Sequence, residues 1–203
     1  MSRAFWDARF RDEEYAYGKE PNDFLRAEAG RIPEGPVLAL AEGEGRNAVF
    51  LASRGHEVTA VDQSEEGLKK AERLAKERGV SLTLIAADLE KFRFEDEAYA
   101  GVVSIFAHLP PELRARVHGQ LASALIPGGV FIMEAYSPEQ LAHGTGGPRD
   151  PSLLASLDEL SAELEGLELE IAREGEREIT EGKFHQGASA TVQIVARRPF
   201  KES

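Results

Sequence analysis

Two periods of hydrophobic and polar residues alternate along the first two thirds of the chain. Apolar runs of strand length are followed by segments in which apolar residues recur at helical spacing, as in Leu68, Ala71 and Leu74. Strands that alternate with helices in this way predict a parallel sheet with both faces covered. We expect strands at 37–41, 57–62, 80–88, 99–107 and 130–136.

Capping residues between these runs predict where helices begin and end. A helix is expected over 46–54, because Gly55 follows it. Ser64 is expected to cap the next helix, whose first turn is acidic and which stops at Gly79. A single helix is predicted over 110–126, since two prolines stand at its start and Pro-Gly-Gly lies beyond its end.

The last third of the chain breaks this rhythm. A long irregular loop is expected over 137–152, and Ser156 with Glu159 predicts a capping box for another helix. Two strand-like runs follow at 167–179 and 189–198. Their eight-residue connection, "TEGKFHQG", is too short for a crossover helix, so they should pair antiparallel. The tail from Phe200 to Ser203 is expected to fray.

Composition narrows the class of protein. The 203 residues suit one domain, and the absence of cysteine excludes disulfides, cysteine-ligated metal sites and a thiol nucleophile. The formal net charge of −12 argues against a nucleic-acid partner. The charged N-terminus is unlike a signal peptide, and no apolar run has the length of a membrane span. We therefore expect a cytoplasmic protein without membrane or nucleic-acid partners, as a monomer or weak homodimer.

A glycine turn follows the first strand and is the main candidate for ligand binding. Gly43 and Gly45 permit close approach of a ligand, and the helix beginning at Arg46 is expected to point its amide groups toward it. The segment "GEGRNA" also satisfies the dinucleotide pattern, with Asp62 at the distance of its ribose-binding acid. A nicotinamide-dependent oxidoreductase is therefore one alternative.

Acidic residues favour a different ligand. Asp62 ends the second strand and can accept both ribose hydroxyls, while Asp88 and the Leu89 amide end the third strand on the same rim and suit an adenine. Glu42 in the turn would repel phosphates but tolerate a cation. These features favour S-adenosylmethionine, which has an ammonium and a sulfonium and carries no phosphate. We also expect Asn47, Gln63 and Phe106 to contact this cofactor.

Several segments together resemble the class I S-adenosylmethionine-dependent methyltransferases. They are "VLALAEGEGRNAVFLA", "VTAVDQS", "AADLEKF", "GVVSIFAHLP" and "LIPGGVFIMEAY". Within that superfamily the chain looks like the small bacterial group around the tellurite-resistance methyltransferase TehB and thiopurine-methyltransferase-like proteins. The chain departs from the pattern at Ala39 and Ala41, where many members carry an acid and a glycine.

The resemblance implies an α/β, three-layer Rossmann-like methyltransferase fold. Its seven-stranded, mostly parallel sheet would have the order 3-2-1-4-5-7-6, with the last strand antiparallel and helices on both faces. One domain would cover 1–203, with an N-terminal helical lid at 1–33 and a substrate-side loop at 137–155. The antiparallel C-terminal pair predicted above fits this ending better than a dinucleotide-binding domain.

The resemblance also suggests where chemistry would occur. His108 follows the fourth strand, which in the family ends beside the transferred methyl group, so it is a candidate general base or orienting group. Tyr136 ends the fifth strand on the same rim and is the second catalytic candidate. In the lid, Tyr17 is a better candidate for a cofactor contact than Trp6. Arg46 and His185 are weaker candidates, and the histidine spacing predicts no metal site.

The sequence therefore predicts a methyltransferase acting on a small molecule, with S-adenosylmethionine as cofactor and S-adenosylhomocysteine as product. A soft acceptor such as a thiolate, selenide or telluride would need no strong base, whereas oxygen or nitrogen would. Two alternatives remain besides the oxidoreductase. One is a non-catalytic S-adenosylmethionine-binding protein, and the other is an interaction protein that uses an inactive methyltransferase fold.

Overall fold

The computed structural model describes residues 1–200, so the end of the tail that was expected to fray, Lys201–Ser203, lies outside the described residues. Seven strands form one sheet in the order β3-β2-β1-β4-β5-β7-β6, as the resemblance implied. They are β1 Val37–Leu40, β2 Val58–Asp62, β3 Thr83–Ala86, β4 Tyr99–Ile105, β5 Leu125–Tyr136, β6 Glu168–Glu181 and β7 His185–Arg197.

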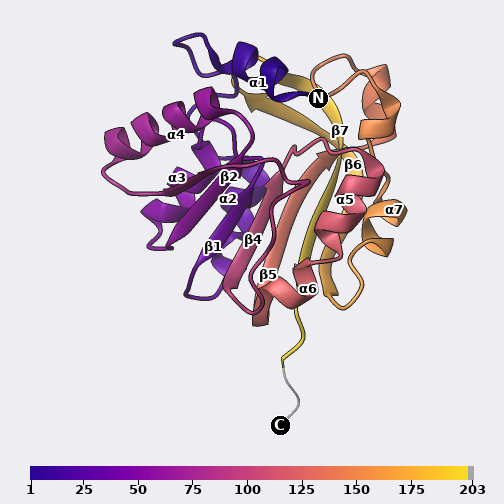
Figure 1. Ribbon diagram of the computed structural model, residues 1–203. Helices are drawn as coiled ribbons and strands as arrows, with labels where there is room; N and C mark the ends of the chain where they lie inside the picture. Colours follow the sequence, from indigo (N-terminus) through magenta and orange to yellow (C-terminus); the bar gives the residue numbers. More distant parts are fainter. Residues whose placement is uncertain (201–203) are drawn as a thin grey trace.

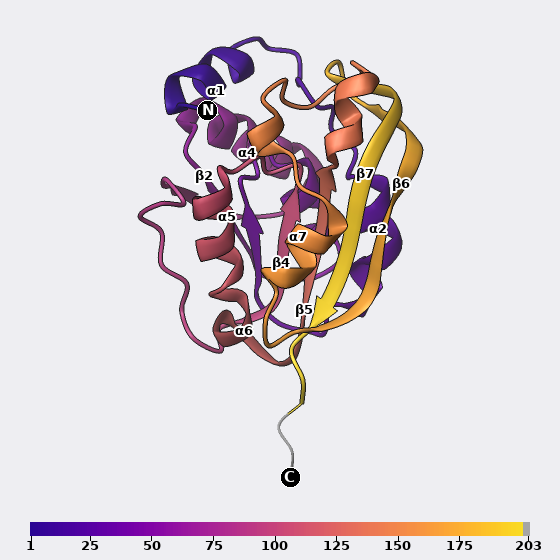
Figure 2. The ribbon, with the colours of Figure 1, turned by 90° about the vertical axis from the view of Figure 1, so that its right-hand side faces the viewer.

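The first five strands run parallel, and the C-terminal pair closes the sheet with antiparallel contacts. β7 pairs antiparallel with both β5 and β6, which confirms the pairing predicted from the short connection. Figure 2 shows β7 pointing opposite to β4. The carboxyl ends of β1, β2, β3 and β4 therefore lie at one end of the molecule, where Figure 1 shows α1 and the N-terminus.

Helices cover both faces of the sheet because the strands alternate their side chains between the faces. Leu38 and Leu40 of β1 belong to a core with α5, α6 and α7, whereas Val37 and Ala39 belong to a core with α2 and α3. The helices are α1 Arg3–Phe10, α2 Asp23–Glu28, α3 Arg46–Ser53, α4 Glu65–Arg78, α5 Pro111–His118, α6 Leu121–Ala124 and α7 Leu157–Ala162. Three short 3-10 segments are η1 Ala29–Arg31, η2 Pro138–Ala142 and η3 Pro151–Leu153.

Two predicted element boundaries after β4 were wrong. The single helix expected over 110–126 is interrupted between α5 and α6, where Gly119 follows the last residue of α5. Glycine weakens a helix at such a point because it loses more backbone entropy than other residues. The Pro-Gly-Gly segment also does not form a loop: Gly128 and Gly129 exchange backbone hydrogen bonds with Arg198, so β5 begins at Leu125 rather than 130.

The other element boundaries differ less from the predicted ones. The third strand is limited to Thr83–Ala86 at the sheet edge, shorter than the predicted 80–88. The capping box of Ser156 and Glu159 is present, and it begins a short helix, α7. The loop expected over 137–152 contains η2 and part of η3. The connection between β6 and β7 is also shorter than expected, so that His185 is the first residue of a strand and not part of a turn.

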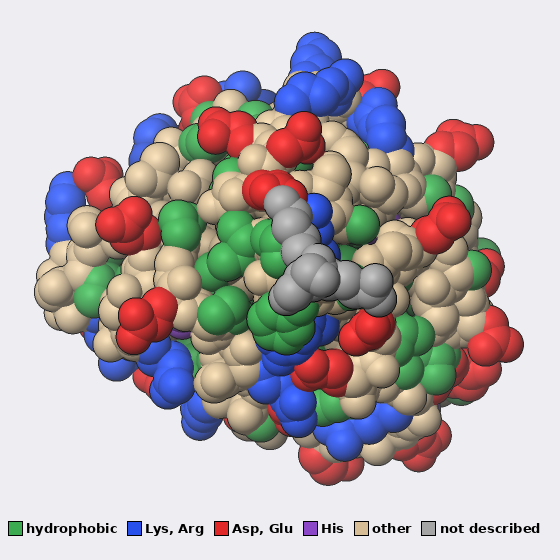
Figure 3. All heavy atoms as spheres, turned by 90° about the horizontal axis from the view of Figure 1, so that it is seen from below, with side chains coloured by type: hydrophobic (Ala, Val, Ile, Leu, Met, Phe, Trp, Pro, Cys, Tyr) green, Lys and Arg blue, Asp and Glu red, His purple; other side chains and the backbone are tan. Residues whose placement is uncertain are grey.

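The opposite end of the molecule differs from the end that carries α1. Figure 3 shows acidic and basic side chains mixed around its edge, with hydrophobic side chains gathered nearer its centre. Phe200 is exposed there and lies over Gly128. Among residues 1–200, no helix has the length and apolar character needed to cross a membrane.

Candidate functional site

A cavity of about 230 Å³ lies at the carboxyl ends of the strands, and we call it the strand-end cavity. It collects residues that are far apart in sequence but follow neighbouring strands. Ten predicted site residues line it: Tyr17, Glu42, Gly43, Asn47, Asp62, Gln63, Asp88, Leu89, Phe106 and His108. The other two, Gly45 and Tyr136, are not part of its lining.

The ends of β1 and β4 carry unusual backbone conformations beside this cavity. Ala41 and Phe106, which follow these two paired strands, have φ of 49° and 52°. Residues other than glycine rarely adopt this left-handed region, at a cost of order 1 kcal/mol each, and such strain gathers at ligand sites. Ala41 therefore holds a conformation that glycine adopts more easily, at the position where the resemblance implies a glycine in many family members.

Asp62 connects β2 to the glycine turn. One carboxylate oxygen accepts the Gly43 amide at 2.9 Å, and the other accepts the Ser64 amide at 2.7 Å. Burial raises the pKa of this carboxyl, while the backbone hydrogen bonds counteract the rise. Each oxygen can accept one further hydrogen bond, so the carboxylate can still bind both ribose hydroxyls.

Glu42 has a different partner from the one expected. Its Oε1 accepts the amides of Asn47 and Ala48 at 2.9 Å and 2.8 Å, so the carboxylate caps α3. The prediction that these first helix amides are directed at a ligand is therefore wrong. Burial raises the pKa of Glu42 to about 7, although the helix amides favour its charged form. A cation in the cavity would favour that charged form further.

Gly45 is needed for the packing of α3 on α4 and does not line the strand-end cavity, so its contact with a cofactor stays a prediction. A Cβ atom at this position would lie 2.5 Å from the Cβ of Ala71 in α4. Its φ of 89° also lies in the left-handed region. Glycine at this position therefore lets α3 approach α4, and it sets the shape of the turn only indirectly.

The third strand end contributes acidic and apolar groups, as predicted. Asp88 uses Oδ1 to accept the Glu90 amide at 2.9 Å, and it remains exposed at the cavity edge. Leu89 beside it is buried, and Gln63 lies across the cavity opening, where its side chain donates to the Met1 carbonyl at 3.4 Å. This part of the cavity thus combines the apolar side chain of Leu89 with the second carboxylate oxygen of Asp88.

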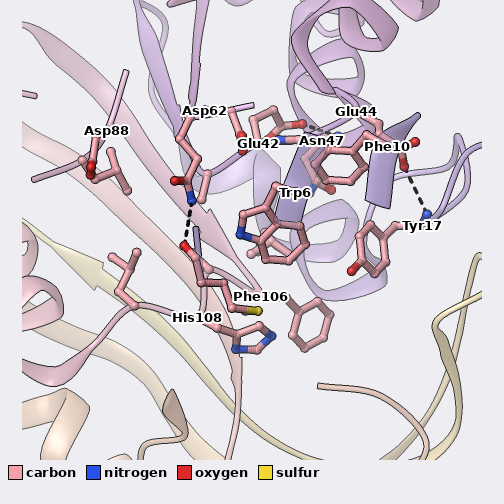
Figure 4. A pocket seen from close by; sticks show the side chains of 18 of the residues that line it. Trp6, Phe10, Tyr17, Glu42, Glu44, Asn47, Asp62, Asp88, Phe106 and His108 are labelled. Carbon is pink, nitrogen blue, oxygen red and sulfur yellow. Dashed lines mark hydrogen bonds between the residues drawn. The ribbon is translucent and has the colours of Figure 1, made fainter. Parts of the chain in front are cut away.

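The N-terminal segment lies across the strand-end cavity. Figure 4 shows Trp6 between the Asp62 side of the cavity and the rings of Phe106 and His108. The Trp6 ring stacks on Phe10 at 5.6 Å between centroids. Helix α1 is attached to the start of α4, because the Ser64 hydroxyl donates to Asp7 at 2.6 Å. The segment thus covers the cavity from the side opposite the strands.

Lys70 of α4 attaches the residues that follow α1. Its ammonium group donates to the carbonyls of Asp12 and Glu14 at 2.8 Å and 2.7 Å and forms an ion pair with Glu44 at 2.5 Å. Both side chains of this pair are almost fully buried. Glu44 also accepts the amide of Tyr17 at 3.3 Å, as Figure 4 shows. One buried ion pair therefore connects the glycine turn, α4 and the N-terminal segment.

A cluster of aromatic rings separates this cavity from a second space. Tyr136 is fully buried and stacks on Phe106 at 4.6 Å and on His108 at 5.6 Å. Its ring is also covered by Gly146 and Gly147. The expectation that Tyr136 forms the pocket wall is therefore wrong, since it lies behind the residues that do.

Two neutral histidines face both spaces. His185 lies 4.5 Å from the Tyr17 ring, and its Nδ1 has no hydrogen-bond partner among the described residues. Burial lowers the pKa of His108 to about 4, and burial also lowers the pKa of His185 well below its usual value. A base of such low pKa is weak near neutrality, so the environment of His108 suits an orienting role better than proton removal.

The second space, which we call the loop hollow, has a volume of about 1390 Å³. It lies beside η2 and the loop that follows it, and the tip of the β6–β7 hairpin closes it. It shares part of its wall with the strand-end cavity, namely Met1, Trp6, Tyr17, His108, Pro110 and His185. A ligand that reaches across this shared wall can therefore contact both spaces.

Comparison with known proteins finds similarity to methyltransferases. Residues 37–129 match the model of a family described as a methyltransferase domain. A structure solved in work on conversion of a disulfide bond into a thioacetal group during echinomycin biosynthesis has a TM-score of 0.78, with 22% identity over 99% of this chain and 93% of that one. The chain has a methyltransferase fold. TehB from Haemophilus influenzae is another structural neighbour, with a TM-score of 0.69 and 19% identity over 87% of this chain and 61% of that one.

Relatives by sequence are methyltransferases as well. The 2-heptyl-1-hydroxyquinolin-4(1H)-one methyltransferase of Mycobacteroides abscessus is 27% identical over 136 residues, which cover 66% of this chain and 60% of that protein. The demethylmenaquinone methyltransferase of Thermus thermophilus is 31% identical over 104 residues, covering 50% of this chain and 47% of that protein. The chain thus spans between about half and three fifths of the length of these two relatives.

Several residues around this methyltransferase fold were missed or undervalued from the sequence. His185 lines both spaces, but nothing in its local sequence distinguishes it from a residue in an exposed turn. Phe10 was missed, although its position four residues after Trp6 puts both on one helix face. Lys70 was missed because it stands among other charged residues of α4. In residues 1–200, no group of three His, Asp or Glu side chains is arranged to hold a metal ion.

Proposed function

We propose that this chain is an S-adenosylmethionine-dependent methyltransferase that acts on a small molecule. The main support is the charge of the strand-end cavity. Five acidic residues line it, namely Glu42, Glu44, Asp62, Asp88 and Glu90. The one basic residue in the lining, Arg46, forms an ion pair with Glu181 at 2.6 Å. Such a cavity suits a cationic ligand without phosphate and disfavours the pyrophosphate of a dinucleotide.

The residues present fit this cofactor. Asp62 would hold the ribose, because each of its oxygens keeps capacity for one more hydrogen bond. Asp88 and Leu89 would contact the adenine, with Gln63 beside it. Glu42, close to ionisation at neutral pH, would stabilise the ammonium group near Asn47. Trp6 and Tyr17 would offer aromatic faces on the side of the sulfonium, an arrangement worth about 1 kcal/mol.

The cofactor would supply a methyl group on a sulfonium, which a nucleophile in line with the carbon–sulfur bond can accept. The protein would position that nucleophile at the shared wall, where His108 and His185 present neutral imidazoles. The N-terminal lid, 1–33, would exclude water from this wall. Because His108 is a weak base, the acceptor is one that ionises unaided, such as a thiolate or another soft anion. We therefore propose a function similar to that of the TehB-like methyltransferases.

The deciding experiment is a thermal-shift titration with S-adenosylmethionine, S-adenosylhomocysteine and NAD. A ligand that binds the native state raises the melting temperature by mass action. We expect both adenosyl ligands to raise it and NAD to leave it unchanged. Asp62→Ala and Asp62→Asn should each remove the ligand-dependent shift, whereas Asp96→Ala, an exposed aspartate outside the cavity, should keep it. A shift with NAD alone would favour the oxidoreductase instead.

Catalysis needs a separate measurement, because a non-catalytic sensor would give the same thermal shifts. Release of S-adenosylhomocysteine should be followed with a panel of aromatic thiols, selenite, tellurite and thiopurines. Turnover of at least one soft acceptor is expected. Tight cofactor binding with no turnover of any panel member would support the sensor.

A further inference from the structure

The loop hollow has a charge opposite to that of the protein as a whole. The chain has 36 acidic and 24 basic residues, yet the basic side chains Arg9, Arg149 and Lys183 line the hollow against one acidic residue, Asp150. Asp150 is already engaged, since its Oδ1 accepts both the amide and the hydroxyl of Ser152. A negatively charged ligand group would therefore meet a favourable local field.

The three basic side chains lack carboxylate partners. Within residues 1–200, none of them forms an ion pair, although most basic residues elsewhere in the described chain do. Arg9 instead stacks over the ring of Phe184 at 4.0 Å, and the Lys183 ammonium lies 5.8 Å from the same ring. Two cationic groups thus stand beside one aromatic surface, without a protein anion to neutralise them.

The same hollow also gathers exposed apolar side chains. Of the six large hydrophobic residues that are exposed among the described ones, four line it: Met1, Phe5, Leu141 and Phe184. Phe5 and Phe184 are 41% and 37% exposed, whereas Trp6 and Phe10, the other aromatic residues of α1, are half-buried and buried. Large exposed apolar side chains that gather at a concave site mark a place where a ligand is bound.

The buried wall between the two spaces supplies an unused polar atom. Nδ1 of His185 is buried without a partner among the described residues, and its residue lines both the strand-end cavity and the loop hollow. A buried polar atom without a hydrogen bond is costly, so a ligand group that donates to or accepts from it is favoured. The reacting end of a ligand in the hollow would meet this atom and His108.

We propose that the methyl acceptor is an aromatic anion: a flat apolar ring system that carries a carboxylate or comparable anionic group apart from its nucleophilic atom. The ring packs on Phe5, Trp6 and Phe184, and the anionic group binds Arg9, Lys183 and Arg149. The nucleophilic atom then lies at His108 and His185, next to the strand-end cavity. This inference rests on the proposed methyltransferase function, whose cofactor site it uses as the neighbouring space.

The test is isothermal titration of the full chain with three probes, 2-naphthoate, 2-naphthamide and acetate, with and without S-adenosylhomocysteine. The naphthoate has both ring and charge, the amide has the ring alone, and acetate has the charge alone. We expect naphthoate to bind about tenfold or more tightly than the amide, and acetate not to bind measurably, since a charged hydrogen bond adds about that factor. Equal affinity for naphthoate and amide, or no binding of either, would overturn the proposal.

Variants of the basic residues test which side chains bind the anionic group of naphthoate. Arg9→Gln with Lys183→Gln should bring naphthoate to the affinity of the amide and leave the amide unchanged, whereas Arg73→Gln, an exposed arginine of α4 outside both spaces, should change neither. A naphthoate preference that survives the double variant contradicts the assignment. If that variant does not fold, raising the salt concentration from about 0.05 M to about 0.5 M on the unaltered protein should weaken naphthoate alone.

The two proposals fail separately in this design. If S-adenosylhomocysteine does not bind but naphthoate is preferred through Arg9 and Lys183, the hollow is an anion site and the methyltransferase function is wrong. If S-adenosylhomocysteine binds and the naphthoate preference is absent, the function stands and the acceptor class is wrong.

Discussion

The strand-end cavity and the loop hollow share a wall but are built in different ways. The cavity is acidic, and its polar groups are fixed by backbone hydrogen bonds at the ends of β1 and β2. The hollow is basic, and its side chains belong to α1, to the loop after η2 and to the hairpin tip. Groups held by a sheet keep one geometry, whereas groups on loops vary easily. Such a division would suit enzymes that share one cofactor, held by the sheet, but differ in the acceptor that the loops bind.

The N-terminal segment is the part that belongs to both spaces. Trp6 and Tyr17 line each of them, and the buried pair of Lys70 and Glu44 holds the chain between these two residues. We therefore predict that variants that break the Lys70–Glu44 ion pair affect both spaces. Variants at the ends of β1 and β2 should affect the strand-end cavity alone.

The largest expected effect is that of Lys70→Met. Removal of the ammonium group leaves Glu44 buried without its cation and frees the carbonyls of Asp12 and Glu14, so we expect a loss of about 3–5 kcal/mol in the free energy of unfolding. Urea unfolding measures this loss, and hydrogen exchange should rise over 3–17. Lys69→Met is the matched control, because its ion pair with Glu66 is exposed, and it should cause no measurable change. Equal behaviour of the two variants would contradict the attachment.

A smaller effect is expected for Gly45→Ala. The added methyl group would clash with Ala71, and the residue would have to keep a left-handed conformation. We expect a loss of about 2–4 kcal/mol in stability, together with weaker binding of S-adenosylhomocysteine. Gly79→Ala has a similar positive φ but open space around its Cβ position, so it should cost only about 1 kcal/mol. If both variants lose the same stability, close packing of α3 on α4 is not the reason for this glycine.

The smallest effect concerns the pH dependence of cofactor binding. With its pKa raised to about 7, Glu42 is largely neutral at pH 6 and largely ionised at pH 8. The ammonium group of the ligand is stabilised by the ionised form, so the affinity of the ligand should rise with pH, by about tenfold between these values. Calorimetry with S-adenosylhomocysteine measures this rise. In Glu42→Gln the rise should be absent, and the ratio between the two proteins cancels any titration of the ligand itself. Parallel pH profiles would exclude Glu42 as the group responsible.

The fold could be predicted from the sequence because its signals are local and repeated. Apolar runs, the cap at Ser64 and the short link before β7 each specify their own neighbourhood, and parallel strands then bring Asp62, Asp88 and Phe106 to one edge. The predictions failed where a residue distant in sequence determines the local structure. Pairing with the chain near Arg198 turns Pro-Gly-Gly into strand, and the first amides of α3 donate to Glu42 instead of to a ligand.

The basic residues of the loop hollow show more clearly what could not be predicted from the sequence. Arg9 lies more than a hundred residues before Arg149 and Lys183, and none of the three stands in a motif. Only the folded chain shows that they line one hollow, with Arg9 and Lys183 beside Phe184. The same holds for Tyr136, whose place at a strand end predicted a pocket wall, but which Gly146 and Gly147 cover.

The wall shared by the two spaces has a thermodynamic consequence. Trp6, Tyr17, His108 and His185 line both spaces, so a ligand that restricts their motion from one space would leave less entropy to be lost when the second ligand binds. Occupancy of one space would then tighten the other, and reciprocity requires the same factor in both directions. A methylated product and the spent nucleoside would accordingly retain one another, and turnover would be governed by how quickly the first of them departs.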